Sequence, residues 1–120
     1  MKQKEIIEKL TIDIQRNAYQ ARIHEHLHTI NYDANMMDYH CNVSRGQAFE
    51  AISILNMMTG SNRGDDIYNR SESEAIDDIK RIEGLHGYTK SGYIALLDAA
   101  GFCGAEHYEV EAKYNPNLPA

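Results

Sequence analysis

Hydrophobic residues recur at helical spacing through the first 30 residues, and neither Gly nor Pro interrupts residues 2–30. On a helical wheel they form two stripes on roughly opposite sides, one of Ile6, Ile7, Leu10, Ile14, Ala18 and Ala21, and one of Ile12, Tyr19, Ile23, Leu27 and Ile30. Two opposed stripes predict a helix that packs against two neighbours. Such a helix would span about 44 Å, whereas a compact domain of this length has a radius of gyration of about 14 Å. We therefore expect a second copy of the chain to cover the overhang.

The same segment also fits the a/d spacing of a coiled coil, which makes it the expected oligomer interface. The seam positions are Ile7, Leu10, Ile14, Asn17, Ala21, His24 and His28. Asn17 would be the polar seam residue that fixes the register of the two helices at some expense of stability. The expected assembly is a homodimer formed through this first helix.

Three shorter helices are expected after the first. Capping boxes that begin at Ser44 and Ser71 predict helices over about 45–58 and 71–85. Thr89 or Ser91 is expected to cap a further helix, which ends at Gly101 with Phe102 folding back on Leu97. The 45–58 helix carries apolar residues nearly all round its circumference, so we expect it to be central and buried.

Two segments alternate between apolar and polar residues at period two, which is typical of half-buried strands. Their apolar positions are Met37, Tyr39, Cys41 and Val43 in one segment, and Tyr108, Val110, Ala112 and Tyr114 in the other. Because an isolated strand needs a partner, we expect the two to pair in a small two-stranded sheet. The predicted fold is thus a single, mainly helical α+β domain over residues 1–115, followed by a frayed tail over residues 116–120.

The polar segment 59–71 contains two glycines and is expected to be a long loop, a kind of segment that is often functional. A partner could contact this loop through Arg63, Asp65, Asp66 and Tyr68.

Composition restricts the classes of function. With 42% hydrophobic and 25% charged residues the chain is an ordinary globular protein. A net charge of −6 argues against nucleic acid as a direct ligand, because nucleic-acid-binding domains need a basic patch. No run of 18 apolar residues and no signal-peptide pattern occur, so we expect a cytoplasmic protein without a membrane segment. Cys41 and Cys103, in no CxxC arrangement, fit a reducing compartment.

His24 and His28 are the candidate metal ligands. They are one helical turn apart, a spacing at which two imidazoles can share zinc or another divalent transition metal. Two ligands do not complete a site, and further ones would have to come from His26, His40, Cys103 or His107. The other interpretation of the pair is that both histidines complete the helix interface, where their protonation would make a dimer sensitive to pH.

No catalytic constellation is expected. His40 and Cys41 would point to opposite faces of a strand, and Cys103 would lie just past a helix C-terminus, where the dipole disfavours a thiolate. A DNA-binding alternative rests on residues 43–48, which have the character of a recognition-helix start. That helix is apolar where base-reading side chains should be.

The sequence therefore predicts a non-enzymatic interaction protein that regulates or inhibits a macromolecular partner, most simply a protein with a basic surface. Small inhibitors of nucleic-acid machinery encoded by phages or mobile elements have this profile. No cofactor is expected. The alternatives are a metal-dependent enzyme or metal sensor that uses His24 and His28, and a dimeric DNA-binding regulator.

Overall fold

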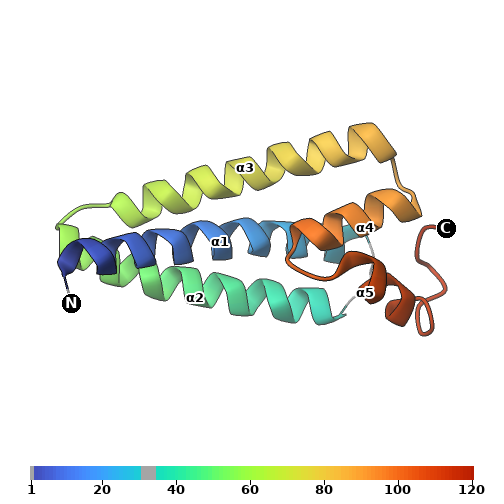
Figure 1. The fold of residues 1–120 in the computed structure, drawn as a ribbon, viewed down its shortest axis with the longest axis horizontal. Helices are drawn as coiled ribbons and strands as arrows, with labels where there is room; N and C mark the ends of the chain where they lie inside the picture. Colours follow the sequence, from blue (N-terminus) through green and yellow to red (C-terminus); the bar gives the residue numbers. More distant parts are fainter. Residues whose placement is uncertain (1, 31–34) are drawn as a thin grey trace.

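The computed structural model describes residues 2–30 and 35–120, with the side chains of residues 35–38 left out of the description. Within these ranges the helices are α1 (Gln3–Ile30), α2 (Asn35–Thr59), α3 (Arg63–His86), α4 (Lys90–Ala99) and α5 (Gly104–Glu111). The first three are long and run alternately up and down beside one another, and α4 and α5 lie at the end where α1 finishes (Figure 1). The molecule is an elongated helical bundle that measures 49 × 26 × 22 Å.

Helix α1 is the central helix, and the prediction that it packs against two neighbours is confirmed. Its first half packs Ile14 against α2 and the start of α3 in a cluster completed by Ala51, Ile52, Leu55 and Ile67. Its second half packs Ile23 and Leu27 against α3 and α4, in a cluster that also contains Tyr108 of α5. Tyr19 ties α1 to α3 through a 2.6 Å hydrogen bond from its hydroxyl to Asp78. Burial and this carboxylate raise the pKa of Tyr19 to about 12.

The predicted two-stranded sheet is wrong, because the described part of the chain contains no strand: the first segment is helical, and the second is helix up to Glu111 followed by a turn. Residues 37–43 form the beginning of α2, in which Cys41 and Ser44 are buried and start a helical stripe that continues through Ala48, Ala51, Ile52 and Leu55. The second segment is largely α5, which buries Gly104 and Tyr108, four residues apart. An alternation at period two over so few residues is compatible with a helix as well as with a strand. The buried residues of these segments are three or four positions apart, which is the spacing of a helix face.

The predicted 59–71 loop is also wrong. Helix α3 begins at Arg63, and Gly60 with its φ of 63° turns the chain between the two helices. The side chain of Asn56 fastens this turn: its Oδ1 accepts a 2.7 Å hydrogen bond from the amide of Gly64, and its Nδ2 donates to Asp65. A Cβ on Gly64 would lie only 3.0 Å from the Cα of Ile52, so the glycine permits the close approach of α2 and α3.

The predicted fourth helix is confirmed as α4. Thr89 caps it by accepting a hydrogen bond from the amide of Gly92. At its end Gly101 has a φ of 96°, and the amide of Phe102 donates to the carbonyl of Leu97, as the predicted left-handed cap requires.

Residues 116–120 do not fray. Pro119 is buried and Leu118 packs against the core, while the hydroxyl of Tyr108 donates a 2.6 Å hydrogen bond to the carbonyl of Pro119. The amide of Lys90 donates to the carbonyl of Ala120, which joins the end of the chain to the start of α4.

Candidate functional site

The residues of the predicted dimer seam lie mostly inside the chain's own bundle. Ile14, Asn17, Ala21 and His24 are at most 6% exposed. Ile7 and Leu10 are half-buried against the cluster between α1 and α2. Helices α2 and α3 cover α1 along its length, so the expected overhang does not exist (Figure 1). A dimer of the folded chain would need another surface, and the oligomeric state itself stays a prediction.

His24, one of the two candidate metal ligands, is enclosed by rings. Its ring centroid lies 5.5 Å from that of His40 and 5.4 Å from that of Phe102. Neither ring nitrogen has a hydrogen-bond partner within normal geometry. Burial, reinforced by His40, lowers the pKa of His24 to about 4, with the backbone carbonyl of Ala100 opposing this shift. The side chain is therefore a neutral imidazole at pH 7 that fills an aromatic cluster.

His28 follows one turn later and is half-buried. Among the residues whose placement is described, no three His, Cys, Asp or Glu side chains come close enough together to hold a metal ion. The pair predicted from the sequence is thus not completed into a metal centre by the fold of these residues.

Cys103 lines a pocket next to Phe102, the residue whose ring contacts His24. Phe102, whose ring stacks on that of His107 at 4.5 Å, lines a pocket of about 290 Å³ together with Cys103, Glu106, His107 and Val110. Cys103 is exposed and lies at the N-cap position of α5, where its side chain makes no capping hydrogen bond. Cys103 follows the C-terminus of α4, as predicted, and the residues after it form α5 and not the predicted strand. His107 is paired with Glu111 at 3.7 Å.

The four residues of the predicted partner-binding loop belong to the first two turns of α3. Asp65 and Asp66 lie in its first turn, where carboxylates interact favourably with the helix dipole. Tyr68 packs its ring on Phe49 at 5.5 Å, and Arg63 is exposed. Asp65, Asp66 and Tyr68 thus have interactions within the chain itself. Their contact with a partner stays a prediction.

The outer face of α2 is the surface that sequence reasoning missed. Six exposed residues lie along it, which we call the α2 stripe: Tyr39, Val43, Gly46, Glu50, Ser53 and Met57. Tyr39 and Met57 are 60% and 82% exposed, and Ile54 at the edge of the stripe is 41% exposed. The signal was present in the sequence, because apolar residues surround this helix. Their interpretation as a buried central helix is wrong, since α1 occupies the centre and leaves one side of α2 facing solvent.

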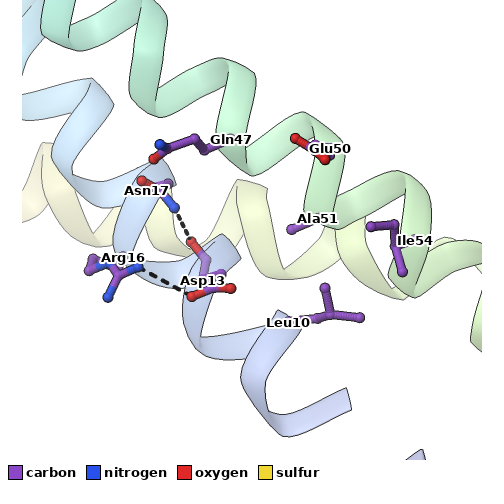
Figure 2. A pocket seen from close by; sticks show the side chains of 8 residues that line it. All are labelled: Leu10, Asp13, Arg16, Asn17, Gln47, Glu50, Ala51 and Ile54. Carbon is purple, nitrogen blue, oxygen red and sulfur yellow. Dashed lines mark hydrogen bonds and ion pairs between the residues drawn. The ribbon is translucent and has the colours of Figure 1, made fainter. Parts of the chain in front are cut away.

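A groove runs between α1 and the edge of the α2 stripe. It has a volume of about 330 Å³ and is lined by Leu10, Asp13, Arg16 and Asn17 from α1 and by Gln47, Glu50, Ala51 and Ile54 from α2 (Figure 2). Leu10, Ala51 and Ile54 gather at one end of the groove, and polar side chains line the other (Figure 2).

The two acidic side chains of this α1–α2 groove differ in whether they have a partner. Asp13 accepts a 3.2 Å hydrogen bond from Arg16, and its backbone carbonyl accepts one from Asn17 at 2.8 Å. Glu50, by contrast, has neither an ion pair nor a hydrogen bond among the described residues. Arg45, the one cation of α2, is committed to Glu25 on α1. Within the described part of the chain, the groove therefore presents an apolar end and the Glu50 carboxylate without an ion pair or hydrogen bond.

The structure does not contain the helix start on which the DNA-binding alternative was based. Residues 43–48 lie in the middle of α2, which runs without a break from Asn35 to Thr59, so no turn places them at the start of a recognition helix. The oligomeric and nucleic-acid-binding properties themselves stay untested.

Comparison of the chain with protein-family models, with curated proteins and with solved structures found no match. None of the described helices combines the length and the apolar character that crossing a bilayer requires. The evidence for function is therefore the surface itself. A helix face with several exposed apolar side chains beside a groove is suited to contact with another helix, which buries its own apolar side there.

Proposed function

We propose that this chain is a non-enzymatic interaction protein that regulates or inhibits a macromolecular partner by occupying its surface, and that the α2 stripe and the α1–α2 groove form the binding surface. The observation that carries the proposal is the alignment of exposed apolar side chains along α2. Full burial of a large apolar side chain is worth about 1.5–3 kcal/mol. Tyr39, Val43 and Met57, with Ile54 at the edge, can supply apolar anchors of an interface that extends along α2.

The partner for which this surface is suited is a protein that presents an amphipathic helix with a basic residue on it. The α1–α2 groove supplies an apolar end for the anchors, and the unpaired Glu50 beside it supplies a carboxylate for a Lys or Arg. The net charge of −6 favours encounter with a basic surface, such as those of nucleic-acid-processing proteins. Cys41 and Cys103 do not form a disulfide with each other, which suits a cytoplasmic location.

Quantitative capture experiments test the proposal. The immobilised protein is incubated with lysate of its native host, and bound proteins are compared between wild type and the variants Ile54→Glu and Met57→Glu. Leu85→Glu is the matched control, because Leu85 is 70% exposed on α3, away from the α2 stripe. Circular dichroism and thermal melts establish that all four proteins are folded.

A partner that is retained by wild type and Leu85→Glu, and reduced at least tenfold by both α2 variants, would support the proposal. Each glutamate places a charge where an apolar contact is expected, a change of about 2 kcal/mol or more per site. Equal capture by all folded variants, or capture of nothing by wild type, would contradict it.

A further inference from the structure

His24 lies where three parts of the chain meet. Its ring on α1 contacts His40 of α2 and Phe102 of the connection between α4 and α5, with centroid distances of 5.5 Å and 5.4 Å. His40 in turn contacts Phe102 edge-on at 5.2 Å. Each of the three rings thus contacts the other two, and this ring triangle joins the beginning of α2 to the rest of the bundle.

The described groups around His24 do not balance a positive charge on it. The residue is 4% exposed, and neither ring nitrogen has a hydrogen bond of normal geometry to the described residues. Burial and the imidazole of His40 lower its pKa, and the backbone carbonyl of Ala100 raises it. A proton on each of the two imidazoles would bring like charges together away from water.

Acidic side chains at this end of the bundle have other partners. Asp98 of α4 accepts a 2.7 Å hydrogen bond from the amide of Gly104. The other titratable side chains that α1 and α2 add near the ring triangle are His28 and Cys41, and neither is a carboxylate. None of the carboxylates is among the groups that shift the pKa of His24. Three further carboxylates form ion pairs, which are Glu25 with Arg45, Glu83 with His26, and Glu111 with His107.

The beginning of α2 is weakly anchored beside the ring triangle. The buried residues among the described side chains of 39–50 are all small, and none belongs to either hydrophobic cluster. Burial of a large apolar side chain is worth about 1.5–3 kcal/mol, and small side chains contribute less. The ion pair of Arg45 with Glu25 is partly exposed, and such pairs contribute about 1 kcal/mol or less. The small buried residues are Cys41, Ser44 and Ala48.

Phe102, on the other side of His24, is held more firmly. Its amide donates to the carbonyl of Leu97, and its ring packs against the cluster that contains Leu97 and Tyr108. A charge inside the ring triangle is therefore relieved at the smallest loss of contacts when the beginning of α2 moves away.

We propose that residues 35–48 of α2 form an acid-sensitive flap, which detaches from α1 when His24 is protonated while the rest of the bundle stays folded. Detachment separates His40 from His24 and lets water reach both rings. Local opening of this kind requires less free energy than unfolding of the whole chain, because only small buried side chains lose their contacts.

The direction of the pH effect follows from the two forms of His24. Its pKa is about 4 in the closed chain and returns toward 6.5 when water reaches the ring. The open form therefore binds one more proton between these values, and the flap opens as the pH falls through this range. Tyr39 and Val43 of the α2 stripe lie on the flap, so opening also displaces one end of the proposed binding surface. This last consequence rests on the proposed function, whereas the opening does not.

Amide hydrogen exchange of wild type tests whether the flap opens by itself. Protection factors, which correct for the direct effect of pH on exchange, are compared between residues 40–46 and 52–58 of the same helix. Residues 40–46 should be less protected, and low concentrations of urea should leave their exchange unchanged while accelerating that of residues 52–58, because a local opening exposes little surface. Equal protection and equal urea dependence in the two halves of α2 would overturn the proposal, whatever the variants show.

A change of pH tests the role of His24. Between pH 7.5 and pH 5 the protection factors of residues 40–46 should fall about tenfold or more in wild type, and by less than about threefold in His24→Phe, which cannot take up the proton. His86→Phe is the matched control and should behave as wild type, because His86 is exposed at the end of α3. An undiminished fall in folded His24→Phe, or no fall in wild type, would contradict the proposal.

Capture of a host protein separates the flap from the proposed function. A partner bound at pH 7.5, and released at pH 5 by wild type more than by His24→Phe, would support both. If exchange shows the acid-driven opening while no partner is captured, the flap stands and the proposed function fails. If Ile54→Glu and Met57→Glu lose a partner while residues 40–46 show no local opening, the proposed function stands and the flap fails.

Discussion

His24 shows how one buried residue can couple stability to pH. Its imidazole is 4% exposed, and among the described residues neither ring nitrogen has a hydrogen bond of normal geometry, the carbonyl of Ala100 being the nearest backbone acceptor that acts on it. A buried polar group without a partner costs about 1–3 kcal/mol. Its pKa in the folded chain is lowered from 6.5 to about 4, which means that the unfolded chain binds one more proton between these two values.

His24→Phe is therefore expected to stabilise the protein by about 1 kcal/mol or more at pH 7, because a phenyl ring fits the aromatic cluster without polar atoms to desolvate. The gain should increase as the pH falls from 6.5 toward 4. In this range protonation of His24 favours the unfolded wild-type chain, and the variant lacks that proton. Urea unfolding at pH 7.5 and pH 5 measures both effects, and a gain that is identical at the two pH values would contradict the assigned environment.

Helix α3 owes its position to a glycine at its start. The amide of Gly64 donates to Asn56, and a Cβ at Gly64 would lie 2.9 Å from the Oδ1 of Asn56 and 3.0 Å from the Cα of Ile52. The backbone of α2 cannot move away without opening the cluster that contains Ile52 and Ile67. The contact between the two helices therefore depends on the missing side chain.

Gly64→Ala should destabilise the protein by about 1–3 kcal/mol, although alanine is the better helix former. Gly84→Ala on the same helix has open space around it and should stabilise by about 0.5–1 kcal/mol. Thermal and urea unfolding of the two variants compares these opposite effects. A stabilising Gly64→Ala would show that α2 and α3 are not in close contact at this point.

For the whole molecule, the docked end of the chain closes the C-terminal cluster. Leu118, Pro119 and Ala120 supply an apolar contact and two backbone acceptors, one for Tyr108 and one for the amide of Lys90. This end of the bundle is built from two short helices, which have little stability apart from packing.

Removal of residues 118–120 should lower the free energy of unfolding by about 2–4 kcal/mol and speed amide hydrogen exchange in α4 and α5 more than in the first half of α1. Tyr108→Phe in the full-length chain is the matched milder variant, which should lose about 1 kcal/mol by giving up the hydroxyl bond alone. Unchanged stability after truncation would show that the tail is not docked in solution.

Taken alone, the sequence determined the helical nature of residues 2–30, the two-sided burial of that helix, and the caps of α4 at Thr89 and Gly101. These features depend on local spacing and local hydrogen bonds, which neighbouring residues specify. The alternation in residues 37–43 and 108–114 was ambiguous, because over so few residues period two fits a strand or a helix. Only the buried positions of α2 and α5 resolve it in favour of helices.

Tertiary structure alone decided which apolar stripe faces which neighbour. The seam from Ile7 to His28 has the pattern of an interface between chains, yet α2 and α3 of the same chain pack on α1, in clusters that contain Ile14 and Leu27. That folding covers the seam chosen from the sequence and leaves the α2 stripe exposed. A hydrophobic pattern specifies that a face must be covered, whereas the path of the rest of the chain determines what covers it.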